Sequence, residues 1–339
     1  MIYSLKKLIT SLIIILFATT PAFATEKLIF SLDLIRHGDR TPIESIPNSP
    51  IQFKEGLGQL TQKGVHQEIA LGKNMRQQYV YRYHLLPEKY NPDTMYVRST
   101  DMSRTILSAD AFLMGLYPPA KRSPYDRPIP IHVVALDRDK LLVSKPKKNI
   151  FSLVYLYYLY QKNWHEMSPP ESKLDYWSKQ TGIPITNFKK LGQLADNLYI
   201  RELNHIPLPN GISNEDANEI ISLDERVMLK AFEVKQITDP MGEEFLKTVK
   251  NYFDEAVHHS SSLKYVLLSG HDSSIMSVMN TLDSPLDKAP PYASRVNFSL
   301  FEENNQYYVK ITYNNKPIYI RKCGSERCSL LQFEKLLSC

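Results

Sequence analysis

The chain has 339 residues, of which 43% are hydrophobic and 23% are charged, and its formal net charge is +5 at pH 7. This length suits one large domain, or one domain that carries a sizeable insertion. The positive charge is small and dispersed, which argues against a nucleic-acid-binding protein.

The first 24 residues are predicted to be an export signal. Lys6 and Lys7 form a short basic region, Leu8 to Phe17 form an apolar stretch, and Ala22-Phe23-Ala24 is a small-x-small cleavage pattern. The stretch is shorter than the roughly 20 residues that span a membrane, and an uncleaved N-terminal anchor is the alternative. Cleavage after Ala24 removes both lysines and so lowers the net charge from +5 to +3. We expect a mature protein without a membrane span, periplasmic or secreted.

Three short apolar segments, each bounded by polar turns, are typical of buried strands. They are Leu28 to Ile35, Met95 to Val97 and Tyr265 to Leu268, and they end at Arg36-His37-Gly38, Arg98-Ser99-Thr100-Asp101 and Ser269-Gly270-His271-Asp272. Helix-forming residues over 62–86 and 103–116 follow the first two clusters. Strands that alternate with helices predict an α/β sheet covered on both faces. Because ligands bind beyond the carboxyl ends of strands in such sheets, we expect the three clusters to converge on one site.

Residues 141–229 are predicted to form a smaller helical insertion. No alternating strand pattern occurs there, Phe151 to Tyr160 indicate a buried helix face, and Pro169-Pro170 and Pro207-x-Pro209 break later helices. Residues 25–140 and 230–339 then form the two parts of the α/β core. In the second part, Arg295 to Glu302 and Gln306 to Tyr313 flank Asn304-Asn305, which predicts a hairpin.

The chain has three cysteines, all near its C-terminus. Cys323 and Cys328 are close enough to close a small loop in an oxidising compartment. A zinc site is the alternative, but no histidine or second cysteine pair lies near them in the sequence. A disulfide is therefore favoured for this pair, whereas Cys339 has no obvious partner.

Arg36, His37 and Arg40 have the chemistry of an oxyanion site. Guanidinium groups bind tetrahedral oxyanions in a bidentate way, and Gly38 allows a ligand to approach the main chain closely. A histidine held among such donors faces the central atom of the oxyanion. Singly, each arginine could be a solvated surface group and His37 a structural residue. Their combination at a strand end favours a site.

The other two clusters are ambiguous on their own. Arg104 would lie near the first turn of a helix, where free N–H groups favour an anion, but a surface arginine on a capped helix is the ordinary alternative. Arg98 could reach the site or support a carboxylate instead. His271 can donate to an oxyanion, and Asp272 can donate a proton if a bound phosphate raises its pKa. Asp272 could instead only cap the helix that follows.

The segment Leu34 to Pro42, with Pro47 following, resembles the signature of the histidine acid phosphatases, a branch of the histidine phosphatase superfamily. The likeness continues through residues 56–61, 96–105, 270–272, 290–294 and 323–328, and it is weakest in the helical insertion. It implies an α/β fold with a mixed-sheet core flanked by helices and a smaller helical insertion domain. The site residues that it implies are His37 as nucleophile, Asp272 as proton donor, and Arg36, Arg40, Arg104 and His271 around the phosphate.

The resemblance also implies the activity. We expect an exported acid phosphatase that hydrolyses small phosphomonoesters through a phosphohistidine, with broad specificity, an acidic optimum and no metal or organic cofactor. No nucleic-acid or membrane partner is implied, and a homodimer is allowed. A phytase-type member of the family and a phosphate-ester-binding protein without turnover are the alternatives, while the export signal argues against a cytosolic mutase. Two positions depart from relatives: Ser274, where phytases usually have Asn, and Ser299, where Glu is frequent.

Overall fold

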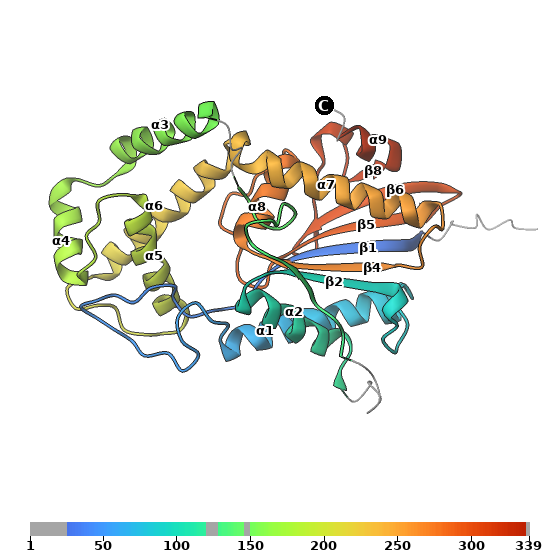
Figure 1. The fold of residues 1–339 in the computed structure, drawn as a ribbon, viewed down its shortest axis with the longest axis horizontal. Helices are drawn as coiled ribbons and strands as arrows, with labels where there is room; N and C mark the ends of the chain where they lie inside the picture. The colour runs from blue at the N-terminus through green and yellow to red at the C-terminus, as the bar shows by residue number, and fades with distance from the viewer. Residues whose placement is uncertain (1–25, 120–127, 146–149, 337–339) are drawn as a thin grey trace, which may run out of the picture.

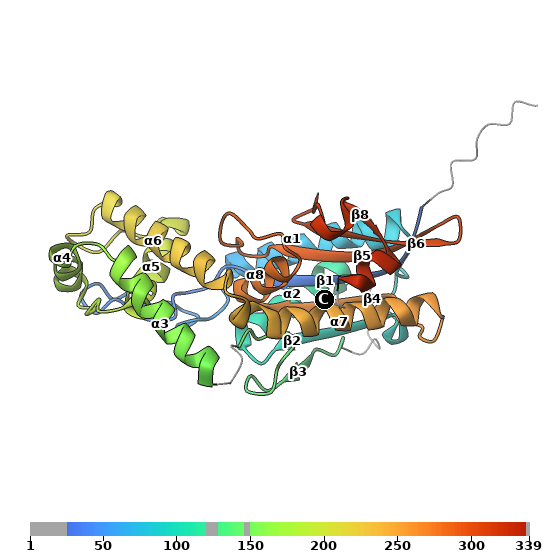
Figure 2. The ribbon, with the colours of Figure 1, turned by 90° about the horizontal axis from the view of Figure 1, so that it is seen from above.

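The computed structural model describes residues 26–119, 128–145 and 150–336, so the predicted export signal and Cys339 lie outside the described residues. A mixed sheet occupies the centre of the larger part of the molecule, with helices on both of its faces (Figures 1 and 2). The predicted α/β architecture is confirmed.

The sheet has the strand order β3-β2-β4-β1-β5-β6-β7, and β8 pairs with β6. The strands are β1 (Lys27–Arg36), β2 (Met95–Thr100), β3 (His132–Val134), β4 (Tyr265–Gly270), β5 (Arg295–Glu303), β6 (Gln306–Tyr313), β7 (Lys316–Pro317) and β8 (Arg327–Ser329). The first four strands pair in parallel, and the later strands pair antiparallel. The predicted hairpin is confirmed, since β5 and β6 pair around Asn304 and Asn305, both with positive φ.

Each face of the sheet has its own hydrophobic core. On one face lie α1 (Gln62–Arg76), which continues as a π-helical turn over Gln77–Arg82, and α2 (Ser103–Leu116). On the other lie α7 (Lys235–Val257), α8 (Asp272–Thr281) and α9 (Leu330–Lys335). Successive side chains of a strand point to opposite faces, so Leu34 packs in the second core and Ile35 in the first. Burial on both faces explains why β1 is almost continuously apolar.

The middle of the chain is helical, as predicted. It forms α3 (Ile150–Met167), α4 (Glu171–Thr181), α5 (Phe188–Leu203) and α6 (Asn214–Phe232). Trp177, Leu194 and Ile220 belong to a separate core shared by α4, α5 and α6. The helices end where the prolines predict, because Pro169-Pro170 separates α3 from α4 and Pro207 to Pro209 separates α5 from α6. The exact boundaries at 141 and 229 stay a prediction, and α6 continues past 229 to Phe232.

The prediction of a buried face at Phe151 to Tyr160 is wrong. This segment is helical, but Val154, Tyr157 and Tyr158 are 58–67% exposed. The helix α3 lies at the outer edge of the insertion (Figure 1), and among its described side chains the aromatic contacts to α5 are those of Tyr160 and Trp164. Nine of the ten residues from Phe151 to Tyr160 are apolar, so apolar side chains cover every side of the helix, and here only one side has a partner among the described helices.

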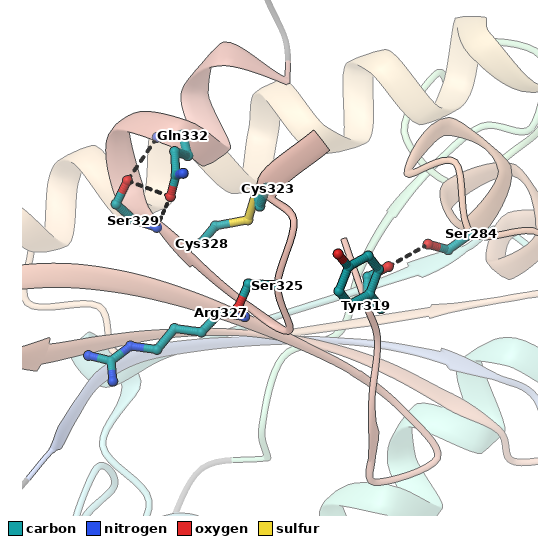
Figure 3. The surroundings of a disulfide bond; sticks show 8 residues. All are labelled: Ser284, Tyr319, Cys323, Ser325, Arg327, Cys328, Ser329 and Gln332. Carbon is teal, nitrogen blue, oxygen red and sulfur yellow. Dashed lines mark hydrogen bonds between the residues drawn. A yellow bond between two sulfur atoms is a disulfide. The ribbon is translucent and has the colours of Figure 1, made fainter. Parts of the chain in front are cut away.

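The predicted disulfide is confirmed. Cys323, which ends a short 3-10 turn, is bonded to Cys328 in β8, beside α9 (Figure 3). Ser329 then caps α9 by accepting the N–H of Gln332. Among the residues that the structure describes, no helix is long and apolar enough to cross a bilayer.

Candidate active site

The three polar clusters meet at the carboxyl ends of β1, β2 and β4. Arg36 lies opposite Gly270 in the parallel pairing of β1 and β4, so His37 and His271 leave the sheet side by side, with ring centroids 5.4 Å apart. A cavity of about 560 Å³ opens there. Its lining includes five of the six predicted site residues: His37, Arg40, Arg104, His271 and Asp272. The sixth, Arg36, contacts Asp272 directly.

His37 is held as a neutral imidazole. Its ring is buried, and Nδ1 lies 2.9 Å from the carbonyl oxygen of Gly38. A carbonyl can only accept, so Nδ1 carries the proton and Nε2 keeps its lone pair. Burial, followed by the charge of Arg36, lowers the pKa of His37 well below its usual value. The side chain therefore has the protonation state that a nucleophile requires.

Gly38 allows the loop after β1 to pack tightly between α1 and α2. Its N–H donates to Ser108 Oγ on α2 at 3.1 Å, and a Cβ at this position would lie 2.5 Å from the carbonyl oxygen of Gly64 on α1. The close neighbour that requires glycine here is thus the α1 backbone. The predicted approach of a ligand to the main chain is not needed to explain it.

Arg36 and Asp272 form an ion pair, with Nη2 and Oδ2 2.8 Å apart. Arg36 also donates to the carbonyl oxygen of Pro290, and Asp272 Oδ1 accepts the N–H of Ser273 at 2.7 Å. Burial alone would raise the pKa of Asp272, but the Arg36 guanidinium lowers it well below its usual range. His271 occupies the N-cap position of α8 and Asp272 is the first residue of the helix, so the alternative in which Asp272 serves as the N-cap is wrong.

Arg40 is held by a carboxylate that sequence reasoning missed. Nη2 donates to Asp196 Oδ1 at 2.7 Å and Nη1 donates to Oδ2 at 3.1 Å, which is the bidentate geometry. Asp196 lies on α5, and its Oδ2 also accepts the N–H of Ile43 at 3.1 Å. Burial disfavours the charged guanidinium, but Asp196 more than offsets this and raises the pKa of Arg40. The helical insertion therefore positions an arginine of the cavity.

Arg104 and His271 face the cavity from α2 and from the end of β4. The buried Nε of Arg104 has no hydrogen-bond partner in the described part of the chain. Burial, followed by the charge of Arg40, lowers the pKa of Arg104 to about 10, so it stays charged at neutral pH. Nε2 of His271 lies 3.1 Å from Thr100 Oγ1, and burial and Arg104 lower the pKa of His271 to about 4. The cavity therefore presents a cation and a neutral imidazole beside His37.

Arg98 follows the second of its two alternatives, because it supports a carboxylate and does not line the cavity. Its Nη2 donates to Asp139 at 2.6 Å, and Asp139 in turn accepts the N–H groups of Leu141 and Leu142. This pair fixes the segment that leads to Val143, which lines the cavity.

Ser299 belongs to a buried hydrogen-bonded network. It donates to Asn297 at 2.6 Å, and Asn297 donates to Ser31 and to Asp33. Asp33 forms an ion pair with Arg295 at 2.6 Å. The hydroxyl of Ser299, the position that departs from relatives, therefore has hydrogen-bond partners on β1 and β5.

A second cavity, of about 260 Å³, adjoins the first and shares Arg40 and Asp272 with it. The insertion supplies much of its lining: Ala195, Asp196, Tyr199, Ile221, Asp224, Glu225 and Met228. None of these was predicted as a site residue. They lie on amphipathic helices, where a polar residue ordinarily faces solvent, so no spacing in the sequence marks them.

Comparison with known families gives one match over most of the chain. The sequence model described as histidine phosphatase superfamily (branch 2) matches residues 27–150 and 214–314. The part left out between these ranges contains α4, α5 and nearly all of α3, so the match covers strands β1 to β6 and the helices α1, α2, α7 and α8 on the two faces, but not most of the insertion.

Individual relatives agree with this match. Prostatic acid phosphatase of Homo sapiens is 29% identical over 327 residues, which cover 90% of this chain and 83% of the human protein. Lysosomal acid phosphatase of Xenopus laevis is 28% identical over 356 residues, covering 97% and 80%. Among solved structures, the phytase of Klebsiella sp. ASR1 superposes with a TM-score of 0.69 at 14% identity, over 93% of this chain and 96% of that one. A Hafnia alvei phytase in complex with myo-inositol hexakis sulphate superposes with a TM-score of 0.66 at 18% identity, over 94% and 97%. These structures share the fold.

Proposed function

Because this chain belongs to branch 2 of the histidine phosphatase superfamily, and within it to the histidine acid phosphatases, we propose that it forms a covalent phosphohistidine on His37. Its class is that of a phosphomonoester hydrolase. The observation that best supports the proposed step is the hydrogen bond from His37 Nδ1 to the Gly38 carbonyl oxygen, which leaves the Nε2 lone pair available at the cavity.

Binding of the phosphoryl group rests on charge. The Nε atom of Arg104 has no hydrogen-bond partner among the described residues, and Arg40 remains charged beside it. A charge pair at about 4 Å is worth around 4 kcal/mol at a near-surface dielectric, before desolvation is subtracted. Arg36 and His271 complete the set of groups that stabilise the equatorial oxygens during transfer.

In the first step, Nε2 attacks phosphorus, the N–P bond forms and the P–O bond to the alcohol breaks. The leaving oxygen needs a proton, which we assign to Asp272. Arg36 keeps the pKa of Asp272 low in the free site, so the proton enters with the substrate, because a phosphomonoester is a monoanion below its second pKa of about 6. The negative phosphoryl group beside Asp272 then raises the pKa of this carboxyl, which allows the proton to pass through it to the leaving oxygen. Loss of the monoanion above that pH accounts for an acidic optimum.

In the second step, water attacks the phosphohistidine. Asp272, now ionised, accepts a proton from the water as the new P–O bond forms, and the N–P bond breaks. Asp272 returns this proton to the product, inorganic phosphate leaves as the monoanion, and His37 regains its Nε2 lone pair. Protons balance over the cycle, and no cofactor takes part in either step.

We also propose that the protein is exported and that residues 1–24 are removed, which leaves it periplasmic or secreted. The disulfide between Cys323 and Cys328 supports an oxidising compartment, and one similar protein is named lysosomal acid phosphatase. Mass spectrometry of the exported protein tests this proposal: an N-terminus at Thr25 is expected, and an intact Met1 contradicts it.

The catalytic proposal is tested with p-nitrophenyl phosphate at mildly acidic pH. The protein should release p-nitrophenol, and His37→Ala should abolish release while circular dichroism stays native. His66→Ala is the matched control, because His66 is exposed on α1 and lines neither cavity of the site. Rapid quenching into alkali, in which phosphohistidine survives, should trap phosphate on His37. Phosphate on another residue, or full activity of His37→Ala, refutes the assignment.

A further inference from the structure

The second cavity is the feature that the phosphoryl-transfer steps leave unused. It lies between α5, α6 and the segment from Ala289 to Tyr292, and it meets the phosphate cavity at Arg40 and Asp272. A group attached to the phosphate through its leaving oxygen can therefore reach it past Asp272. Its volume of about 260 Å³ is below the roughly 300–1,000 Å³ of drug-sized sites, so it suits a small group.

The cavity carries excess negative charge. Four carboxylates line it, those of Asp196, Asp224, Glu225 and Asp272, against the two guanidiniums of Arg36 and Arg40. Asp196 and Asp272 are each paired with one arginine, and one oxygen of Glu225 accepts the N–H of Ala289 at 2.8 Å. Asp224 has neither an ion pair nor a hydrogen bond within the described ranges, and it packs against Gly192 of α5.

Two tyrosines form aromatic walls beside these carboxylates. Tyr292 is 9% exposed, lines the cavity, and forms no hydrogen bond through its hydroxyl among the described residues. The ring of Tyr199 lies 6.3 Å from that of Tyr292, and Ile221 and Met228 add apolar surface. Aromatic faces together with carboxylates are the groups that recognise alkylammonium ions.

We propose that this cavity binds a cationic ammonium group on the alcohol part of the substrate, so that phosphomonoesters of small amino alcohols are the preferred class. This inference rests on the proposed function, since it assigns the leaving-group subsite of the same centre. The excess negative charge should in turn disfavour substrates that carry several further phosphates, such as inositol polyphosphates.

The preference for substrates with a cationic ammonium group over neutral substrates should increase as the pH rises. Burial, followed by Asp196, Asp272 and Glu225, raises the pKa of Asp224 to about 7. The charged or titratable groups around it come from every side of the cavity: Asp196 and Tyr199 from α5, Glu225 from α6, Asp272 from α8, Arg36 at the end of β1, Arg40 in the loop after β1, and Tyr292 before β5. At acidic pH Asp224 is neutral, and as the pH rises through 7 it gains the charge that attracts the cation.

The decisive comparison uses two isosteric substrates, phosphocholine and 3,3-dimethylbutyl phosphate, which differ in the charge of the terminal group. With the full chain at pH 7.5, kcat/KM for phosphocholine should exceed that for the neutral isostere at least tenfold, and the ratio should be smaller at pH 5. Phytate should be a poorer substrate than either. A ratio at or below one at pH 7.5 overturns the inference. Because this comparison uses the unmodified protein, it decides the matter even if a variant fails to fold.

Variants identify the carboxylate responsible. Asp224→Asn should lower the ratio several-fold and remove its pH dependence, whereas Glu215→Gln, an exposed acid on the same helix, should leave both as they are. If the ratio of the two kcat/KM values changes with pH in Asp224→Asn as it does in the unmodified protein, this pH dependence comes from the substrates. That result would overturn the proposal that Asp224 attracts the cation. The two proposals fail in different ways: no release from p-nitrophenyl phosphate contradicts the proposed function, and release without a preference for phosphocholine contradicts only this inference.

Discussion

Arg40 illustrates how a single side chain of the site is shared between two parts of the molecule. It follows β1 in sequence, but both of its Nη atoms are bound by Asp196 of the insertion. The carboxylate fixes the direction of the guanidinium and keeps it charged. Preorganisation of this kind costs nothing during the reaction, because the cation is already in place when charge develops on the phosphoryl oxygens.

Removing this arginine should impair transition-state binding. Arg40→Ala should lower kcat/KM by on the order of 10²- to 10³-fold, as loss of one preorganised donor does, and Arg40→Lys should recover only part of it because a point charge cannot replace the fork. Steady-state kinetics with p-nitrophenyl phosphate measure this. Arg98→Ala is the matched control, because Arg98 is bound to Asp139 and does not line the cavity. Its loss should lower the free energy of unfolding, and the inhibition constant for inorganic phosphate should stay unchanged. Full activity of Arg40→Ala removes Arg40 from the site.

Asp272 allows proton donation to be separated from phosphate binding. Asp272→Ala should retain affinity for inorganic phosphate, since a negative charge beside the anion is removed while the oxyanion ligands remain. Turnover should fall steeply for alkyl phosphates, whose leaving oxygen needs a proton, and less for p-nitrophenyl phosphate. Values of kcat for a series of leaving groups check this. An equal loss across the series contradicts the general-acid role and indicates instead that the buried Arg36 has lost its partner.

At the scale of elements, α1 and α2 approach each other through glycine. A Cβ on Gly72 would collide with the carbonyl oxygen of Phe112, and one on Gly115 would collide with that of Ile69. These helices cover the face of the sheet on which the side chains of Ile35 and Val97 lie. Their close packing holds Ser108 against Gly38, and so it fixes the loop that carries the nucleophile.

Adding one methyl group at this contact should therefore be costly. Gly72→Ala should lower the free energy of unfolding by about 1–3 kcal/mol, the usual cost of overpacking, measured by urea denaturation. Gly192→Ala is the matched control, because its Cβ would meet only the Asp224 carboxylate, a side chain that can move. That variant should be neutral or gain up to about 1 kcal/mol from helix propensity. Equal stability of both variants contradicts the packing argument.

For the molecule as a whole, one buried acid links stability to pH. Glu68 of α1 is fully buried, and neither carboxylate oxygen has a hydrogen-bond partner among the described residues. Burial raises the pKa of Glu68 well above its usual value, so the folded protein keeps a proton that the unfolded chain releases above about pH 4.3. The stability contributed by this proton is complete at lower pH and is lost progressively as the pH rises toward the folded-state pKa.

The expected slope is a loss of about 1.4 kcal/mol of unfolding free energy per pH unit. Glu68→Gln, which has the same shape but no ionisable proton, should flatten the slope and be more stable than the unmodified protein at pH 7. Urea denaturation from pH 4.5 to 7.5 measures both. Glu55→Gln, an exposed acid, should leave the slope unchanged. A slope that persists in Glu68→Gln assigns the pH dependence to other groups.

The elements whose pattern is local could be predicted from the amino-acid sequence. Apolar runs ending at Arg36-His37, Arg98 and His271-Asp272 identified three parallel strands of the core. They also identified the edge of the sheet where ligands bind, because the polar residues directly follow the carboxyl end of each strand. The signature around His37 identified the family, and the spacing of Cys323 and Cys328 predicted their bond.

Which side chains face each other depends on the packing of the whole fold and could not be predicted. Asp196 and Asp224 lie on amphipathic helices, and nothing in their spacing distinguishes a carboxylate that meets Arg40 or a cavity from one that meets water. The exposure of Tyr157 on α3 and the burial of Glu68 on α1 depend likewise on where neighbouring helices lie. The periodicity of a strand or helix is visible in its own sequence. The element that it packs against depends on contacts between segments far apart in the chain.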